Sequence, residues 1–354
     1  MIPENINRII DHTKKQFKNG NRQLPGSFLI TGTNGVGKSW ILSEVFKAIE
    51  SEKNIKCIWL PMQITGENLV KTIEDLLQKA KMDELLLIAN EKKSNYLFFI
   101  ENLDRIFDKP VSGTKKPKRA YGTAQQQYAQ MQYASELRAF LNQNTGHVAL
   151  ISSCTSNYNW INDYDQPFFN FFNIIKVEPL NPSEIFEYCQ SLISIPAINT
   201  SEFLIDIFGD NKIRFISILT EGRLIYGRLL AESIERLEVK SSTRKEILQS
   251  LLNDYFSIIE HYMWSIIEKM SLDEKRALEK IVLLGNDFTI KDIVDENKNR
   301  SRIMKNLTQK KLILPVTLKS GEVRFRVQNT LLIAWLRQKK QYDLQAVLEG
   351  ARLQ

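Results

Sequence analysis

The stretch that decides the fold is Gly32-Thr33-Asn34-Gly35-Val36-Gly37-Lys38-Ser39, which has the pattern GxxxxGK[ST]. An apolar run, SFLIT, precedes it, and a helical pattern follows over residues 39–51. The glycines let successive backbone N–H groups turn inward around an anion, because side chains would obstruct that concavity. The start of a helix adds partial positive charge at the same point. The stretch therefore predicts a phosphate-binding loop between a buried strand and a helix.

The chemistry of this loop predicts ATP with Mg²⁺ as its ligand. Lys38 supplies a full positive charge against the β- and γ-phosphates, and Ser39 can place its hydroxyl on Mg²⁺. Trp40 is included among the predicted nucleotide contacts because it follows the loop directly. The alternative is a chance glycine-rich turn, which the strand before it and the helix after it argue against.

A magnesium–nucleotide site also needs an acidic residue at the end of a second buried strand. The apolar run YLFFI ends at Ile100, and ENLDR follows it. Glu101 is the predicted carboxylate that holds the water shell of the metal. In many ATPases the next residue is a carboxylate that polarises the attacking water, but here it is Asn102, and an amide cannot accept a proton. Hydrolysis is therefore predicted to be slow unless Glu101 or Asp104 takes that role; for Asp104, a surface ion pair with Arg105 is the alternative.

Short apolar runs alternate with helical patterns over the first 180 residues, which is typical of a parallel sheet wrapped by helices. We expect strands at residues 27–31, 56–60, 96–100, 148–152 and 174–177. Ser152 and Ser153 stand at the end of the fourth expected strand, where a hydroxyl can contact the γ-phosphate or the attacking water. The alternative for both is an ordinary strand-end hydroxyl. The predicted fold class is α/β.

From residue 181 the strand patterns stop, and helices are expected to about residue 268. Ser271 followed by Glu274 is a capping-box signature that predicts another helix start. Two further short helical patterns lead to an expected hairpin, with strands at residues 312–318 and 323–328. Three helices followed by a hairpin is the order of a winged helix-turn-helix. The predicted domains are an α/β core over 1–180, a helical lid over 181–268 and a winged-helix domain over 269–354.

Cations gather on the third helix and the hairpin of this last domain. In a winged helix the third helix enters the DNA major groove and the hairpin contacts phosphates. The polar side chains predicted to face outward are Asn299, Arg300, Arg302, Lys305, Lys310, Lys311, Lys319, Arg324 and Arg326. The side chains predicted to face inward are Ile303, Met304 and Leu307. Double-stranded DNA is therefore a predicted partner; the alternative is a solvated helix on a protein-binding module. The basic loop 115–119 is a second candidate contact, although its composition favours a mobile solvated loop.

Composition limits the other classes of function. The chain has 354 residues and 43% hydrophobic residues, which excludes wholesale disorder. A formal charge of +7 permits nucleic-acid binding without being diagnostic of it. The three cysteines, Cys57, Cys154 and Cys189, lie too far apart for a disulfide framework or a zinc cluster. No apolar stretch approaches the roughly 18 residues of a membrane span, and the first residues lack the apolar block of a signal peptide, so a cytoplasmic protein without membrane contact is expected.

Taken together, these motifs resemble the AAA+ and STAND branches of the P-loop ATPases, in particular the group near origin-recognition-type initiators and archaeal-type ATPases. The resemblance rests on GTNGVGKS, FFIENLDRIF, ALISSCTS, PFFNFFNIIKVEPLNPSEI and TEGRLIYGRLL, followed by the winged helix. FIENLDR is also similar to the DDLDR strand end of the KAP group. The resemblance implies a three-layer P-loop NTPase core with a five-stranded sheet and a helical lid whose arginine touches the γ-phosphate. Arg223 is the candidate for that arginine, with Arg214 and Arg228 as competitors.

One departure from the family pattern bears on function. Ring-forming AAA+ proteins usually carry an arginine finger between the fourth and fifth strands, but residues 153–175 contain no Arg or Lys. Either Arg138 or Arg105 replaces it, or the protein does not use the standard ring. This favours a switch over a processive motor. Together with the basic winged helix, the phosphate loop predicts an ATP-dependent switch that binds DNA. The alternative is a STAND-type regulator, for example of a bacterial defence or transposition-like system, in which ATP gates oligomerisation and the winged helix binds a partner protein.

Overall fold

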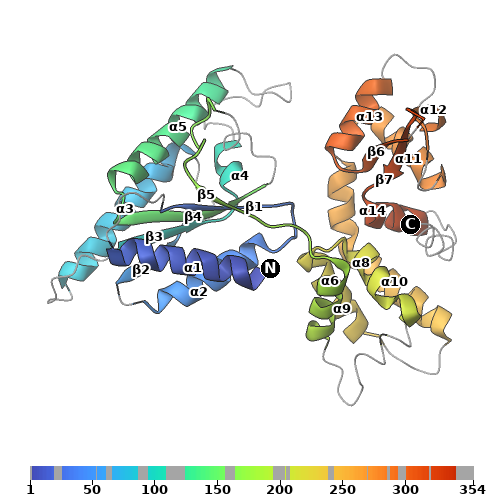
Figure 1. Ribbon diagram of the computed structural model, residues 1–354, viewed down its shortest axis with the longest axis horizontal. Coiled ribbons are helices and arrows are strands. Elements are labelled where there is room, and N and C mark those ends of the chain that lie inside the picture. Colours follow the sequence, from blue (N-terminus) through green and yellow to red (C-terminus); the bar gives the residue numbers. More distant parts are fainter. Residues whose placement is uncertain are drawn as a thin grey trace. The chain divides into compact units, whose positions relative to one another are not determined.

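The computed structural model describes residues 2–19, 26–52, 54–60, 66–86, 95–108, 124–155, 164–193, 204, 208–237, 243–268, 270–284, 288–293, 300–318 and 320–339 (Figure 1). The chain divides into two compact units, Met1–Glu178 and Pro179–Gln354. The predicted separation of a lid from a winged-helix domain falls inside the second unit and stays a prediction. No described helix combines the length and the apolar character that a membrane crossing requires.

Among the described residues, a five-stranded parallel sheet forms the centre of the first unit. Its strands are β1(Phe28–Thr31), β2(Ile55–Trp59), β3(Asn95–Ile100), β4(Val148–Cys154) and β5(Asn173–Lys176). They lie in the order β2-β3-β4-β1-β5, so that β1 pairs with β4 on one side and with β5 on the other. The predicted α/β class with a parallel sheet is confirmed.

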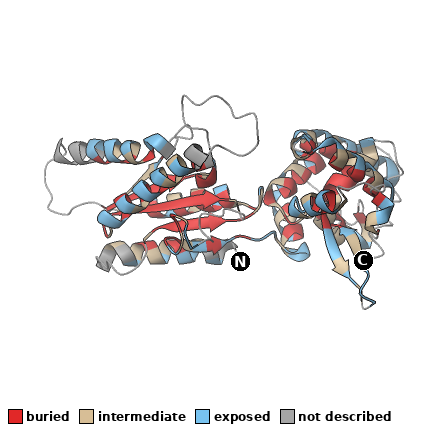
Figure 2. Ribbon diagram, turned by 90° about the horizontal axis from the view of Figure 1, so that it is seen from above, coloured by how far each residue is buried: buried red, intermediate tan, exposed pale blue. Residues whose placement is uncertain are grey.

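Helices cover both faces of this sheet and give three layers. They are α1(Ile2–Asn19), α2(Lys38–Glu50), α3(Gly66–Leu86), α4(Leu103–Asp108) and α5(Ala124–Gln143). Figure 1 shows α1 and α2 on one face and α3, α4 and α5 on the other. Strands covered on both faces are apolar along their whole length, and every residue of β3 is buried. Figure 2 shows the strands buried between the helices.

Strand β4 is longer than the apolar run that predicted it. The expected strand ended at Ser152, but the ladder with β1 continues through Ser153, which pairs with Ile30, to Cys154, which pairs with Thr31. All seven residues of β4 are buried. Both serines therefore lie inside the sheet rather than at its exposed tip.

The second unit begins with a helical lid. Its elements are α6(Pro182–Leu192), η2(Gly209–Asn211), α8(Lys212–Thr220), α9(Leu224–Glu235) and α10(Arg244–Ile267). The winged-helix elements follow as α11(Leu272–Leu284), α12(Ile290–Ile293), α13(Arg300–Gln309), β6(Ile313–Thr317), β7(Val323–Val327) and α14(Thr330–Lys339). The predicted capping box is confirmed, because Ser271 N–H donates to the Glu274 carboxylate and Glu274 N–H donates to Ser271 Oγ. The last helix, α14, was not predicted; it contacts α8 and α10 of the lid as well as α11.

A tight turn joins α8 to α9 in the lid. Glu221 and Gly222 both have left-handed backbone conformations, with φ of 49° and 67°. Leu180 N–H donates to Gly222 O at 2.8 Å. A Cβ atom at Gly222 would lie 2.2 Å from Leu180 O and 3.0 Å from Leu180 N. Only glycine fits here, because the neighbouring backbone leaves no room for a Cβ atom, and the positive φ angle is unfavourable for a residue that has one.

We predict that Gly222→Ala lowers the free energy of unfolding by about 3 kcal/mol. Roughly 1 kcal/mol comes from the positive φ, and about 2 kcal/mol from the overpacking against backbone atoms that cannot move aside. Gly321→Ala is the matched control, because its φ is 82° but an added Cβ meets nothing within 4 Å. The free energy of unfolding of that variant is expected to fall by only about 1 kcal/mol. Denaturant unfolding measures both, and equal losses would contradict the packing argument.

Candidate nucleotide site

The glycine-rich loop starts directly after β1 and is anchored at the neighbouring strand end. Val177 N–H donates to Thr31 O at 2.7 Å. A Cβ atom at Gly32 would lie 2.6 Å from Val177 O and 2.9 Å from the Cγ2 atom of Val36. Because Val177 O belongs to the backbone, it cannot yield to a side chain. Gly32 is thus required by a close approach of two backbone segments, and the buried side chain of Val36 packs beneath the loop.

Lys38 is the first residue of α2, and its side chain turns back into the loop. The side chain is buried, with 7% of the residue exposed. Its Nζ donates to Gly32 O at 2.8 Å and to Thr33 O at 2.9 Å. Burial lowers the pKa of Lys38, while attraction to Asp104 opposes that shift. The loop thus holds a cation whose desolvation is unfavourable and which gains from any further negative charge brought close.

Asp104 supplies the opposite charge near Lys38. It lies in the first turn of α4, just after β3, and only 5% of it is exposed. Its Oδ2 accepts a hydrogen bond from Thr155 N–H at 3.1 Å, whereas its buried Oδ1 has no hydrogen-bond partner among the described residues. An unsatisfied buried carboxylate oxygen is costly. Of the two carboxylates predicted here, Asp104 is thus the one that the structure brings into electrostatic contact with Lys38; Glu101 is half-buried.

The turn after β3 is held by the serines of β4. Asn102 has a left-handed φ of 54°, and its N–H donates to Ser153 Oγ at 3.0 Å. Ser152 is fully buried, and its Oγ donates to Ile100 O at 3.0 Å. The Ser152 proton is therefore used within the sheet, and Ser153 positions the turn that carries Glu101 and Asn102.

The remaining predicted loop residues differ in how far they are buried. Asn34, Ser39 and Trp40 are exposed, and Gly37 precedes α2 with a left-handed φ of 106°. Thr33 Oγ1 is buried without a hydrogen-bond partner among the described residues. Hydroxyl and carboxylate oxygens from Ser39, Glu101 and Asp104 are the hard ligands that Mg²⁺ prefers. The residues present therefore fit a phosphate with bound Mg²⁺. Their oxygen atoms are of the kind that Mg²⁺ prefers, and two buried oxygens, Thr33 Oγ1 and Asp104 Oδ1, have no hydrogen-bond partner among the described residues.

The arginines predicted to act on the nucleotide differ in their partners and in their exposure to solvent. Arg223 Nη2 lies 3.1 Å from Glu221 Oε2, and its guanidinium stacks over Tyr226 at 5.5 Å. Arg228 pairs with Glu232 on the exposed face of α9. Arg214 is half-buried on α8, and Arg105 is exposed on α4. Arg138 donates to Pro167 O at 2.9 Å and covers the Phe171 ring, so this finger candidate is tied into the first unit.

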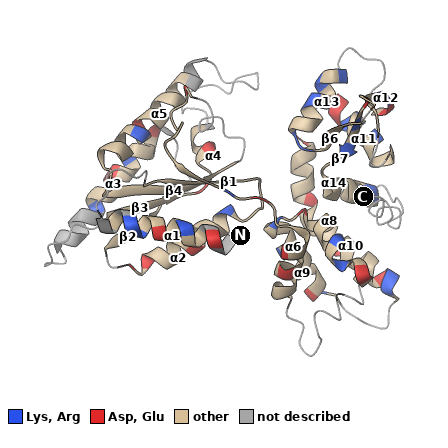
Figure 3. Ribbon diagram, viewed as in Figure 1, with Lys and Arg blue, Asp and Glu red and all other residues tan. Residues whose placement is uncertain are grey.

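The winged-helix surface follows most of the predicted pattern. Ile303, Met304 and Leu307 are buried, as predicted. Arg302, Lys305 and Lys311 are exposed, and Figure 3 shows basic segments on α13 and β7. Arg300 and Arg324 are half-buried, and Arg326 is exposed. Asn299, Lys319 and the loop 115–119 lie outside the described residues.

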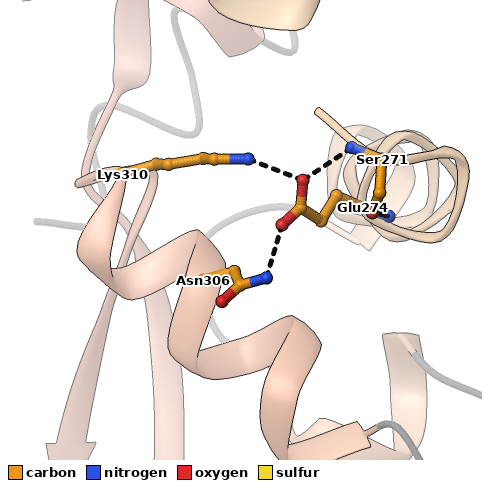
Figure 4. A network of polar contacts seen from close by, with 4 residues as sticks. All are labelled: Ser271, Glu274, Asn306 and Lys310. Carbon is orange, nitrogen blue, oxygen red and sulfur yellow. Dashed lines mark hydrogen bonds and ion pairs between the residues drawn. The ribbon is translucent and has the colours of Figure 1, made fainter. Parts of the chain in front are cut away.

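Lys310 is exposed, as expected, and it also has a partner that the sequence did not indicate. Its Nζ donates to Glu274 Oε2 at 2.6 Å, while Asn306 donates to Glu274 Oε1 at 2.8 Å (Figure 4). Glu274 is only 3% exposed. The Lys310 charge therefore pairs with a buried carboxylate between α11 and α13, while Lys310 itself is exposed. Periodicity on one helix could not reveal this pair, because the two residues are 36 positions apart.

Similarity to known proteins was found among solved structures only. No protein-family model and no curated protein matches this sequence. The solved ORC1 protein of Aeropyrum pernix, in complex with DNA, is 12% identical, with 99% of this chain and 91% of that chain covered and a TM-score of 0.45. RuvB of Thermotoga maritima is 12% identical, covering 96% and 95%, with a TM-score of 0.42. Cdc6p from Pyrobaculum aerophilum is 9% identical, covering 94% of each chain, with a TM-score of 0.40.

We predict an acid-sensitive contribution of Glu274 to the stability of the winged-helix elements. Burial opposes its ionisation, but the hydrogen bonds from Lys310, Ser271 and Asn306 outweigh burial and lower its pKa below the ordinary 4.5. A carboxylate with a lowered folded pKa stabilises the fold above its unfolded pKa and loses that contribution as the pH falls through the folded value. Stability should therefore fall as the pH drops below 4.5.

Glu274→Gln is expected to lower the free energy of unfolding by about 2 kcal/mol at pH 7, because the buried ion pair is broken. The same change should flatten the dependence of stability on pH below 4.5. Glu187→Gln, which changes an exposed carboxylate on α6, is the control. It should leave the stability at pH 7 and the pH dependence of stability unchanged. Thermal unfolding between pH 3 and pH 7 measures both, and a profile of Glu274→Gln parallel to that of the wild type would contradict the assignment.

Proposed function

We propose that this protein binds ATP with Mg²⁺ at the loop Gly32–Ser39 and hydrolyses it slowly. The observation that carries the proposal is the buried Lys38 ammonium, held by two loop carbonyls beside Asp104. A buried cation with neutral acceptors is a favourable site for a phosphate, because the anion adds the charge that the carbonyls lack. Backbone N–H groups of the loop and the N-terminus of α2 support the same ligand.

Each residue of the site has a proposed role in this reaction. Lys38 binds the β- and γ-phosphate oxygens, and Ser39 and Glu101 hold the metal, directly or through its water shell. Mg²⁺, when bound, neutralises charge on the phosphates. Asp104 has a buried oxygen available to accept a proton or to orient water, whereas the Asn102 amide cannot accept a proton. The absence of a second carboxylate directly after Glu101 supports slow turnover.

We further propose that the nucleotide state changes how the winged helix binds DNA. Arg223 is the proposed lid residue for the γ-phosphate. The exposed Arg302 and Lys305 on α13 are the proposed phosphate contacts to a duplex, because their apolar neighbours on that helix face the core. Contacts of this kind are independent of base sequence and sensitive to salt.

A second candidate function is a regulator whose winged helix binds a partner protein and whose ATP state gates oligomerisation. Two observations favour it. The charge of Lys310 is paired with that of Glu274, which reduces its attraction for a phosphate. The hairpin exposes two apolar side chains, Leu314 at 48% and Val323 at 46%. Light scattering with and without ATP separates the candidates, because only the regulator requires ATP-dependent assembly.

The ATPase proposal predicts that Lys38→Ala abolishes turnover. Glu101→Gln and Asp104→Asn should each lower kcat at least tenfold, because each removes a charge from the metal or the water. Asp104→Asn keeps an oxygen that can accept the Thr155 N–H, so it should fold normally. Lys47→Ala and Asp75→Asn are exposed controls and should leave turnover unchanged. Phosphate release measures all five variants, and undiminished turnover in Lys38→Ala would show that the site is elsewhere.

The DNA proposal predicts a steep salt dependence of binding. Arg302→Gln combined with Lys305→Gln should reduce the slope of log K against log salt by about 2, since each phosphate contact contributes roughly 0.9. Lys79→Gln combined with Lys245→Gln removes two exposed charges elsewhere and should leave the slope close to that of the wild type. Fluorescence anisotropy with a labelled duplex measures the slopes. Equal slopes in both double variants, or no binding at low salt, would remove DNA as the partner.

A further inference from the structure

Trp40 differs from the other tryptophans that the structure describes. It is the third residue of α2 and is 46% exposed. Trp59 packs against Phe99 with ring centroids 5.3 Å apart, and Trp264 packs against Trp335 at 5.5 Å. Within the described part of the chain, the Trp40 indole has neither a ring partner nor a hydrogen bond. The face of its ring is therefore open to a planar ligand.

Packing of the first unit does not require a tryptophan at this position. The buried side of α2 is formed by Lys38, Ile41, Leu42, Val45 and Ile49. At about 100° per residue, Trp40 lies on the opposite side of the helix. Glu44 and Lys47 share that side, one and two turns further along, and form an ion pair at 2.9 Å. The exposed side of α2 is thus charged beyond Trp40, and the ring of Trp40 fills no space in the core.

The geometry of a helix start directs this ring toward the phosphate-binding loop. In a helix each Cα–Cβ bond tilts toward the N-terminus, and a long side chain covers the turn before its own residue. For Trp40 that turn is the end of the loop, because α2 begins at Lys38 and Gly37 directly precedes it. Ser39, the neighbour of Trp40, is exposed as well. An aromatic ring and a hydroxyl thus lie together at the solvent side of the loop.

A nucleoside attached to phosphates in this loop meets two different sides of α2. The phosphate chain binds the loop amides and the helix N-terminus. The sugar and the base cannot enter the buried side, where Ile41 and Leu42 are 0% exposed. The exposed side remains, and Trp40 is the aromatic residue that α2 presents there. Stacking of a base on an aromatic ring is worth roughly 5- to 150-fold in affinity and tolerates any base.

We propose that Trp40 is the stacking surface for the base of the nucleotide, and so a specificity-determining residue that separates nucleoside phosphates from inorganic phosphates. The inference rests on the proposed function, since it takes the phosphates to be those bound at the loop. Lys38 and the loop amides attract any polyphosphate, because they act on its charge. The indole adds affinity only for a ligand that carries a planar ring. The ligand class selected by the first unit is therefore a nucleoside di- or triphosphate.

The first test is calorimetry on the full chain with Mg²⁺ and two ligands, a non-hydrolysable ATP analogue and inorganic tripolyphosphate. Trp40→Ala should weaken binding of the ATP analogue about tenfold, because the stack is lost. Its affinity for tripolyphosphate should stay that of the wild type, which also shows that the variant is folded. Trp40→Phe keeps an aromatic face and should lose less affinity for the analogue than Trp40→Ala does.

Tyr128→Ala is the matched control, because it removes an exposed aromatic ring from α5 of the same unit. It should leave both affinities unchanged. An affinity for the ATP analogue that Trp40→Ala does not change, or an equal loss of affinity for both ligands, would overturn the inference.

The second test uses ADP, which separates a contact to the base from a contact to the γ-phosphate. ADP and the ATP analogue carry the same base, so Trp40→Ala should weaken the binding of both by the same factor. A loss confined to the ATP analogue would place Trp40 beside the γ-phosphate and overturn the inference.

Failure of this inference and failure of the proposed function give different results. If the wild-type protein binds the ATP analogue and Trp40→Ala binds it equally well, the proposed phosphate site stands and the role of Trp40 falls. If the wild-type protein binds neither the ATP analogue nor tripolyphosphate, both fall.

Discussion

The ammonium group of Lys38 is buried and therefore needs hydrogen-bond acceptors, which the first unit provides. The loop carbonyls of Gly32 and Thr33 accept its hydrogen bonds, and they are in place because Gly32 fits directly against Val177 at the end of the sheet. Asp104 adds a negative charge from the first turn of α4, which follows β3. The order of the sheet places β1 next to β4, and β4 next to β3, so these groups converge at one edge. The proposed chemistry depends on this arrangement.

The second unit uses buried carboxylates to join elements that are distant in the chain. Glu274 caps α11 and binds two side chains from the α13 region. Glu221 leaves the lid turn and meets the first amides of α14. In both cases the carboxylate lies at a helix N-terminus, where the helix dipole favours negative charge, and a cation completes the neutralisation. Such contacts make the relative position of the elements depend on charge, and a ligand that alters the charge can alter the position.

Several features could be predicted from the sequence because their signals are local. The apolar run of β3, the glycine pattern of the loop and the capping box at Ser271 each lie within a few residues, and all three predicted the observed local structure. The end of β4 was not predicted, since Ser152 and Ser153 are polar, although the ladder with β1 continues through them. The partners of Lys310 and Glu221 lie 36 and 110 positions away, so no local pattern indicated them. Helix α14, with its buried Trp335, was also missed.

The proposed chemistry requires that a triphosphate binds at the loop Gly32–Ser39. The most direct measurement is a crystal structure of the full chain grown with Mg²⁺ and a non-hydrolysable ATP analogue. We expect the phosphates to lie against the loop amides, with Lys38 Nζ moved from the carbonyls of Gly32 and Thr33 to the phosphate oxygens. A structure in which the analogue binds elsewhere, or in which Lys38 keeps both carbonyl bonds and no phosphate lies beside it, would contradict the account.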